Sequence, residues 1–262
     1  MIKDSSIRKR VILLLVCVIV TLTIAAKMIS GFWVQKRADE AYKAMRQKPV
    51  EVKKTEAVVA ESQAAETAVG AGNTEVIKQP DFAELQKENP DIYAWISIPD
   101  TNIDYPVVQH ATDNTYYLEH NLDGSKGYPG CVYSEKENRK DFADFQTVLY
   151  GHNMRNGTMF HDLKYFLEDE FLSQHPYIYI YTETATYQYE IFAAYEYDDE
   201  HLLHAFSYDR QEDVQRYADE IAKYNANGEE LMLSIESNIL TLSTCISDKD
   251  DKRLLVQGIL LE

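Results

Sequence analysis

The clearest candidate for chemistry in this sequence is Cys245, at the end of the segment 238–245. Leucines alternate with hydroxyl side chains along this segment, which predicts a half-buried strand that ends at the thiol. The polar run 247–252 predicts a loop, and a second apolar strand follows with Arg253 at its start. If the two strands pair, a permanent cation lies across the hairpin from a thiol. Such a neighbour favours the thiolate, which is the nucleophilic form.

A thiol also needs a group that can move protons, because only a few per cent of an ordinary thiol is ionised near neutral pH. Among the seven histidines, His152 follows a predicted strand over 147–150 and comes directly after Gly151. Glycine permits an unusual backbone conformation, and strand ends are where a rigid scaffold displays functional groups. His152 is therefore the predicted partner of Cys245. The histidines taken as ordinary surface residues are His120, His161, His201 and His204.

The other two cysteines, Cys17 and Cys131, give no sign of a metal or redox site. The chain has no CxxC pair, so neither a zinc site nor a redox dithiol is expected. The sequence allows one disulfide between Cys131 and Cys245. The simpler interpretation of Cys131 is a small buried residue on a strand, since free cysteine is among the most buried residue types.

The elements that must position these groups begin near residue 80. A short capped helix is expected over 81–86, and residues 209–226 have the spacing of an amphipathic helix. The predicted strands are 95–99, 103–108, 128–133, 147–150, 177–181, 187–195, 238–245 and 254–261. Many short strands at regular intervals with one inserted helix indicate a mainly β fold, a closed barrel of about eight strands.

The N-terminal segment predicts a membrane anchor. Residues 1–10 are basic, and residues 11–34 are apolar enough for a helix about 36 Å long, which exceeds a hydrocarbon layer of about 30 Å. The basic flank should stay inside the cell, which leaves the rest of the chain outside. The alternative is a cleaved signal peptide. Its best cleavage box, Ile24–Ala26, begins with a bulky branched residue, so an uncleaved anchor is favoured.

Composition divides the chain into four parts. Residues 1–10 are expected to be a cytoplasmic tail, 11–34 the transmembrane anchor, 35–79 a stalk or linker, and 80–262 the catalytic domain. The linker is charged at first and then rich in Ala, Glu, Val and Thr. Because it contains so few aromatic side chains, it cannot bury enough surface to fold alone.

Charge is unevenly distributed along the chain, whose net charge is −17. Residues 1–48 carry ten Lys and Arg against three acids, whereas residues 82–262 carry 13 against 34, a net of −21. So acidic a domain opposes nucleic-acid binding, which requires a basic surface. It is compatible with cationic or neutral partners, or with a simply solvated surface.

These pieces, taken in order, resemble class B sortases, the membrane-anchored cysteine transpeptidases of Gram-positive bacteria. The resemblance covers roughly residues 80–262. The segments that carry it are Asn89–Ile96, Tyr105–Gln109, Asp113–Leu118, Tyr150–Asn153, Thr241–Cys245 and Arg253. Each segment alone is a weak signal, and their order behind an N-terminal anchor makes the match specific.

The resemblance implies that Cys245 attacks a Thr carbonyl in the C-terminal sorting motif of a secreted protein. His152 would serve as general acid and base, and Arg253 would hold the substrate and stabilise the oxyanion. An amine of a peptidoglycan precursor, or of a pilin, would then resolve the acyl-enzyme. We expect Ser243 and Thr244 to contact the substrate, although Ser243 could equally be an inward or cross-strand hydroxyl. The family needs no metal or organic cofactor for this chemistry.

Two other classes remain open at the level of the sequence. One is an extracellular cysteine hydrolase in which water resolves the acyl-enzyme. The other is a non-catalytic adhesion or wall-binding module. For the transpeptidase, the acidic domain predicts a preference for Lys or Arg near the scissile Thr.

Overall fold

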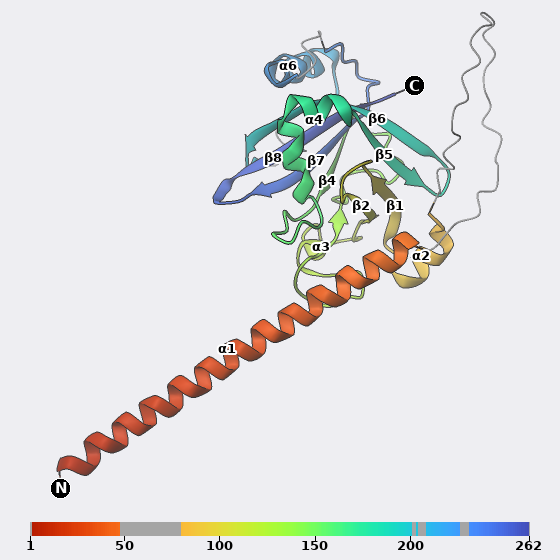
Figure 1. Ribbon diagram of the computed structural model, residues 1–262. Helices are drawn as coiled ribbons and strands as arrows, with labels where there is room; N and C mark the ends of the chain where they lie inside the picture. Colours follow the sequence, from red (N-terminus) through yellow and green to blue (C-terminus); the bar gives the residue numbers. More distant parts are fainter. Residues whose placement is uncertain (1, 48–79, 201–202, 204–207, 226–230, 262) are drawn as a thin grey trace, which may run out of the picture.

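The computed structural model of the protein describes residues 2–47, 80–200, 203, 208–225 and 231–261. Within these residues, the strands close into one barrel in the order β1-β2-β3-β4-β7-β8-β6-β5 (Figure 1). The strands are β1 (Ile92–Ser97), β2 (Asp104–Val108), β3 (Val132–Tyr133), β4 (Gln146–Tyr150), β5 (Tyr177–Thr182), β6 (Thr186–Asp198), β7 (Ile239–Ile246) and β8 (Lys249–Leu260). The predicted eight-stranded barrel is confirmed.

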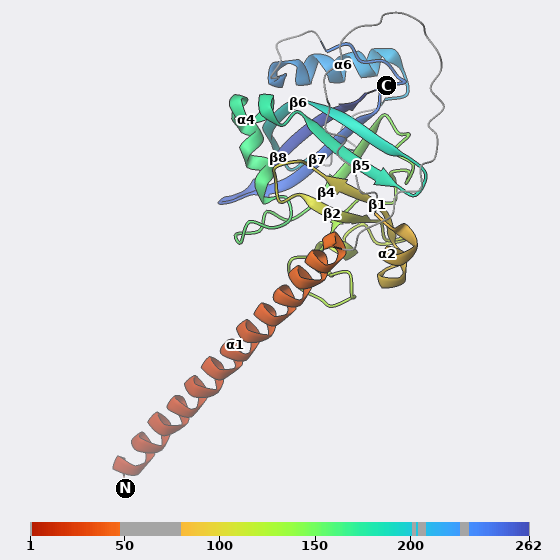
Figure 2. The same ribbon diagram turned by 45° about the vertical axis from the view of Figure 1, so that its right-hand side comes forward.

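The helices lie around the outside of this barrel (Figures 1 and 2). They are α1 (Ile2–Gln47), α2 (Phe82–Glu88), α3 (Tyr116–Glu119), α4 (Asp169–Gln174) and α6 (Gln211–Ile221), with 3₁₀ turns η1 (His161–Leu167) and η2 (Ala222–Tyr224). The sequence predicted α2 and α6. Elements of four to seven residues are too short to show a helical period, so α2 was recognised from its capping residue Asp81. The elements α3, η1 and α4 have no side-chain cap and were missed.

Most strand boundaries lie within three residues of the prediction, and those of β3 and β8 differ by more. β8 begins at Lys249 rather than at Arg253, because its first residues form the exposed tip of the β7–β8 hairpin and need no apolar side chains. The turn is closed by Asp248, which takes a φ of 64°, a conformation that Asp tolerates better than most residues. The predicted strand 128–133 shrinks to β3, because Pro129 has no N–H for a ladder and Gly130 takes a φ of 66°.

Strand β7 is buried on both of its faces, which corrects the prediction of a half-buried strand. Leu240 and Leu242 lie in the barrel interior. The hydroxyl of Thr241 lies on the outer face, where it accepts hydrogen bonds from Gln146 (3.1 Å) and Gln257 (2.9 Å). Helix α6 covers that outer face (Figure 2). Thr241 of β7 is therefore buried and satisfied by its hydrogen bonds to the two glutamines.

Helix α1 runs as one rod from residue 2 to residue 47 and meets the barrel at its C-terminal end (Figures 1 and 2). It is the helix in the described part of the chain that is long and apolar enough to cross a membrane. Its last turns continue into the range predicted as a stalk. The rest of that stalk, 48–79, lies outside the described residues.

The end of α1 packs on the barrel through two side chains. Tyr42 is 3% exposed; its hydroxyl donates to the carbonyl of Gly130 (2.7 Å), and its ring meets Tyr105 edge-on. Arg46 donates to the carbonyl of Asp104 (2.7 Å) and lies over the ring of Tyr105. The helix therefore has a specific seat beside β2 and the segment before β3.

Candidate active site

The parallel pairing of β4 and β7 brings His152 and Cys245 to the same edge of the sheet. In this pairing Tyr150 lies opposite Ser243, and the N–H of Gly151 then donates to the carbonyl of Ser243 (3.2 Å). His152 and Cys245 each stand two residues beyond the paired positions. Because parallel strands end at a common edge, two residues far apart in the sequence are placed at the same level.

Arg253 reaches the same place through the β7–β8 hairpin, in which it is the direct cross-strand partner of Cys245. Residues opposite each other in antiparallel strands project to one face with their Cβ atoms about 5 Å apart. Cys245 is exposed, whereas Arg253 is partly buried. The predicted cation and thiol are therefore neighbours on the outer face of the barrel.

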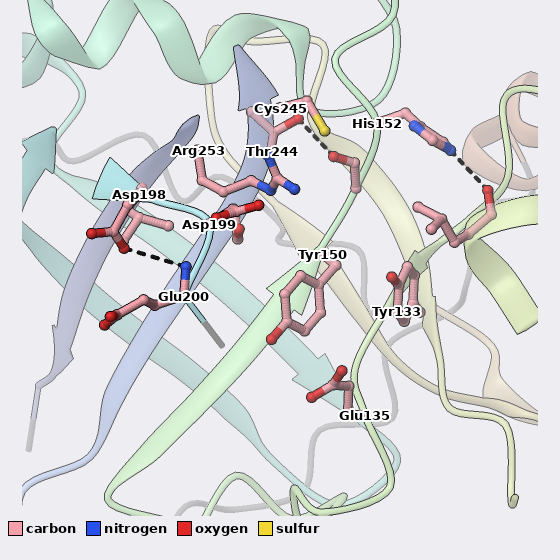
Figure 3. Close-up of a pocket in the computed structure, with 14 residues that line it drawn as sticks. Tyr133, Glu135, Tyr150, His152, Asp198, Asp199, Glu200, Thr244, Cys245 and Arg253 are labelled. Atoms are coloured by element: carbon pink, nitrogen blue, oxygen red, sulfur yellow. Dashed lines mark hydrogen bonds between the residues drawn. The ribbon is translucent and has the colours of Figure 1, made fainter. Parts of the chain in front are cut away.

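The three predicted residues line one groove of about 240 Å³ (Figure 3). Ser243 and Thr244 form part of its floor. The remaining walls are formed by Leu118, Tyr133, Glu135, Tyr150, Gly151, Asp198, Asp199, Glu200 and Leu255. Leu118, Tyr150 and Gly151 belong to segments that carried the family resemblance. Sequence reasoning missed the other six, because no local pattern in the sequence marks them.

Two stacked tyrosines, Tyr133 and Tyr150, make one wall of the groove, with ring centroids 5.4 Å apart. Burial raises the pKa of both phenols well above the ordinary value, and the nearby carboxylate of Glu135 raises it further. Both hydroxyls therefore stay neutral near pH 7. Since Tyr133 is only 7% exposed, the wall offers a substrate mainly the partly exposed side chain of Tyr150.

The opposite wall is acidic. Asp198 ends β6, and Asp199 and Glu200 follow it at the start of the connection to α6; all three line the groove that holds Cys245 and Arg253 (Figure 3). The backbone N–H of Glu200 donates to the Asp198 carboxylate (3.2 Å). The negative charge that the sequence showed for the whole domain is thus present at the groove itself.

The imidazole of His152 points away from the sulfur (Figure 3). Its Nε2 lies 2.8 Å from the carbonyl oxygen of Leu118, and because a carbonyl only accepts, Nε2 carries the hydrogen. The ring also meets Tyr128 edge-on, with centroids 5.1 Å apart. In this orientation the ring is bonded to Leu118 and is turned away from Cys245 (Figure 3).

Gly151 proves necessary for packing rather than for an unusual backbone conformation. A Cβ at this position would lie 2.8 Å from the ring of Phe160, closer than carbon atoms approach. The carbonyl of Gly151 accepts a hydrogen bond from the Thr244 hydroxyl (2.6 Å). That hydroxyl fastens the histidine loop to β7, so it is already engaged before any substrate binds.

Cys131 is separate from the groove. All three cysteines are free thiols, so the disulfide that the sequence allowed between Cys131 and Cys245 is absent. Cys131 is 1% exposed and precedes β3 directly, and burial raises the pKa of its thiol to about 12. The interpretation as a small buried residue is confirmed.

Comparison with known proteins agrees with this geometry. The Sortase domain family model matches residues 96–261. The chain is 35% identical over 183 residues to Sortase B of Listeria monocytogenes, covering 69% of this chain and 74% of that protein. It is 29% identical over 169 residues to Sortase B of Staphylococcus aureus, covering 64% of this chain and 68% of that protein.

Solved structures give the same result. Clostridium perfringens sortase B superposes with a TM-score of 0.62 at 33% identity, covering 69% of this chain and 99% of that chain. A Staphylococcus aureus sortase B–substrate complex has a TM-score of 0.62 at 27% identity, covering 69% of this chain and 84% of that chain. Fold, groove and sequence relatives agree: this chain belongs to the sortase family, as a class B sortase and hence a cysteine transpeptidase of the cell surface.

Proposed function

We propose that the enzyme cleaves a C-terminal sorting motif after Thr and transfers the client protein to an amine of a peptidoglycan precursor. The observation that supports this best is the meeting of Cys245, Arg253 and His152 in one open groove on the barrel's outer face. The aromatic wall and the acidic wall flank the groove that we assign to the peptide.

The reaction proceeds in two halves. In the first, the Cys245 thiolate attacks the Thr carbonyl carbon, and the bond to the following residue breaks as His152 gives a proton to the departing amine. This leaves a thioester on Cys245. In the second half the acceptor amine attacks the thioester carbon, His152 takes the proton from that amine, and the sulfur leaves as thiolate. One amide bond is exchanged for another.

Arg253 stabilises the negative oxygen of both tetrahedral intermediates. Its position opposite Cys245 puts a planar cation next to the attacked carbonyl, where charge develops. Ser243 lies in the groove floor on the same face as Cys245, and we assign it to contact with the substrate backbone. Thr244 supports the site chiefly through its bond to Gly151.

The acidic wall supports a preference for a sorting motif with Lys or Arg near the scissile Thr. Asp198, Asp199 and Glu200 line the same groove as the nucleophile. A basic side chain of the bound peptide gains from their combined field, most strongly at low salt.

The enzyme is held at the cell membrane by a single pass of residues 11–34, with residues 80–262 outside the cell. Support comes from the apolar stretch of α1 and the basic residues before it. A mature protein that is recovered from the culture medium with its N-terminus near Lys27 would contradict this topology and support a cleaved signal peptide.

The test of the proposed function uses full-length protein in detergent micelles and a panel of motif peptides, with and without an amine acceptor, read by mass spectrometry. A ligated product from one peptide is expected, and Cys245→Ala should abolish it. The control is Cys17→Ser, which removes a thiol from the predicted anchor and should leave turnover intact.

The other outcomes identify the alternative classes. Hydrolysed peptide without ligated product, at any acceptor concentration, would indicate a cysteine hydrolase. Neither turnover nor a covalent adduct of Cys245 with a thiol-reactive motif peptide would indicate a non-catalytic wall-binding module.

A further inference from the structure

We propose that Asn153, His161 and Lys164 form a hydrogen-bonded chain that positions the loop of His152 against Cys245. The inference rests on the proposed roles of His152 and Cys245. It concerns residues that touch neither the substrate nor the reacting atoms, so we regard all three as positioning residues.

The chain runs from the exposed Lys164 in the middle of η1 to the end of β7. Lys164 Nζ lies 2.7 Å from His161 Nε2, and His161 Nδ1 lies 3.0 Å from Asn153 Oδ1. Asn153 Nδ2 in turn lies 3.0 Å from the carbonyl oxygen of Cys245. Asn153, the residue after His152, thus bonds the backbone of the nucleophile directly, and His161 and Lys164 follow behind it in the chain.

The two ends of the chain allow only one direction of donation. A lysine ammonium has donors and no acceptor, so His161 Nε2 must accept and the ring must be neutral, with its hydrogen on Nδ1. Nδ1 then donates to Asn153 Oδ1. The Asn153 amide consequently turns its NH₂ toward Cys245, whose carbonyl can only accept. Every member therefore fixes the orientation of the next.

The residues that follow His161 in η1 are anchored to the rest of the domain. The neighbouring Asp162 is 4% exposed and accepts two bonds from Asn102, from the backbone N–H (2.8 Å) and from the side chain (2.9 Å). Leu163, one residue further on, lies in the barrel core. The loop itself is closed, because the N–H of Phe160 donates to the carbonyl of His152 (3.0 Å).

The consequence is that His152 is fastened on both sides. On one side, Gly151 is bound to Ser243 and Thr244 of β7. On the other side, Asn153 is bound to Cys245. Loss of the second fastening would let His152 move relative to the sulfur, and a displacement of about 1 Å in a catalytic group costs about 100-fold in rate.

The experiment measures kcat and KM of transpeptidation for full-length variants in micelles. Asn153→Ala should lower kcat about 10- to 100-fold with KM nearly unchanged, because the groove walls that bind the peptide stay in place. His161→Leu should have a smaller effect of the same kind, and Lys164→Met the smallest, because that residue is exposed. The matched control is Asn156→Ala in the same loop, whose side chain, among the described residues, bonds Asp39 of α1 and Thr158 of the loop but has no bond to β7.

Two further substitutions at one position separate positioning from packing. His161→Gln supplies an N–H for Asn153 and a carbonyl for Lys164, so it should restore most of the kcat that His161→Leu loses. His161→Glu has acceptors only. It would draw the Asn153 NH₂ away from Cys245, and it should be at least as slow as the leucine variant.

Equal kcat values for His161→Gln and His161→Leu, or a kcat of Asn153→Ala equal to that of wild type, would overturn the inference. If Asn153→Ala fails to fold, the pair at position 161 still decides the question. A wild-type enzyme without any turnover would instead refute the proposed function, so the two failures are distinguishable.

Discussion

Cys245 and Arg253 face each other directly across the β7–β8 hairpin. Seven residues separate them in the chain, and the tight turn at Ser247–Asp248 returns the backbone so that their side chains share one face. The hairpin therefore holds the backbones of the proposed nucleophile and the proposed cation in direct register.

Arg253→Lys should lower kcat/KM about 100-fold, although charge is kept, because lysine lacks the planar fork that can bond the oxyanion and the substrate backbone together. Steady-state cleavage of the motif peptide measures this. Lys252→Met, one position earlier on β8, is the control and should behave like wild type. An unchanged kcat/KM for the lysine variant would remove Arg253 from the mechanism.

His152→Ala should reduce the rate of acylation by about 10²- to 10⁴-fold, the usual contribution of a general acid. Single-turnover measurement of the first product reports that step directly. His175→Gln, which removes the ring near Asp100, serves as the control for loss of a histidine. An intact acylation rate in His152→Ala would show that another group protonates the leaving amine.

Neutralising the acidic wall with Asp198→Asn, Asp199→Asn and Glu200→Gln together should raise KM roughly tenfold for a peptide with Lys beside the scissile Thr. KM for the matching neutral peptide should stay the same, and the difference should shrink at high salt. The same three-charge change at Glu168, Asp169 and Glu170 is the control. A library that shows no preference for basic peptides at low salt would refute the charge argument.

Cys131 should resist alkylation at pH 8 in the folded protein, because burial raises the pKa of its thiol to about 12. In a Cys17→Ser background, mass spectrometry should find one adduct, at Cys245, and a second only after denaturation. A second adduct on the native protein would contradict the buried position.

The same thiol makes stability depend on pH in one direction. An unfolded thiol ionises near pH 8.5, whereas the folded one stays protonated until about 12. The contribution of Cys131 to the free energy of unfolding is therefore complete below pH 8.5 and is lost as the pH rises from there. Cys131→Ser should remove this part of the alkaline loss in a denaturant titration. An alkaline loss of the same size in that variant would show that other groups cause it.

The sequence predicted the strands of the site better than their surroundings. Alternating side chains located β7, and the polar run after it located the hairpin, so Cys245 and Arg253 could be paired before any coordinates. The parallel pairing of β4 with β7 left no local signal, since their residues are more than 90 positions apart. His152 could therefore be predicted as a site residue because it follows a strand. Its position beside the end of β7, where Cys245 lies, could not be derived.

Contacts between side chains from distant segments could not be predicted either, because they also leave no local signal in the sequence. Thr241 looked solvent-facing by period, yet α6 covers it and a polar network satisfies it. His161 was taken as an ordinary surface residue, because nothing near it in the sequence shows that the loop returns to place it beside Asn153. Which side chains meet across the barrel depends on tertiary packing, and tertiary packing leaves no periodic pattern in the sequence from which it could be predicted.

The seat of Tyr42 on the barrel has a consequence for where the enzyme can work. If residues 11–34 cross the bilayer, the helix rises only about 12 Å from Val34 to Tyr42 at about 1.5 Å per residue. A short helical connection of that length, unlike a long flexible linker, keeps the groove in a thin layer just above the lipid headgroups. Client proteins that are still embedded in the same membrane would reach that layer by lateral diffusion. Proteins already released from the membrane would seldom enter it.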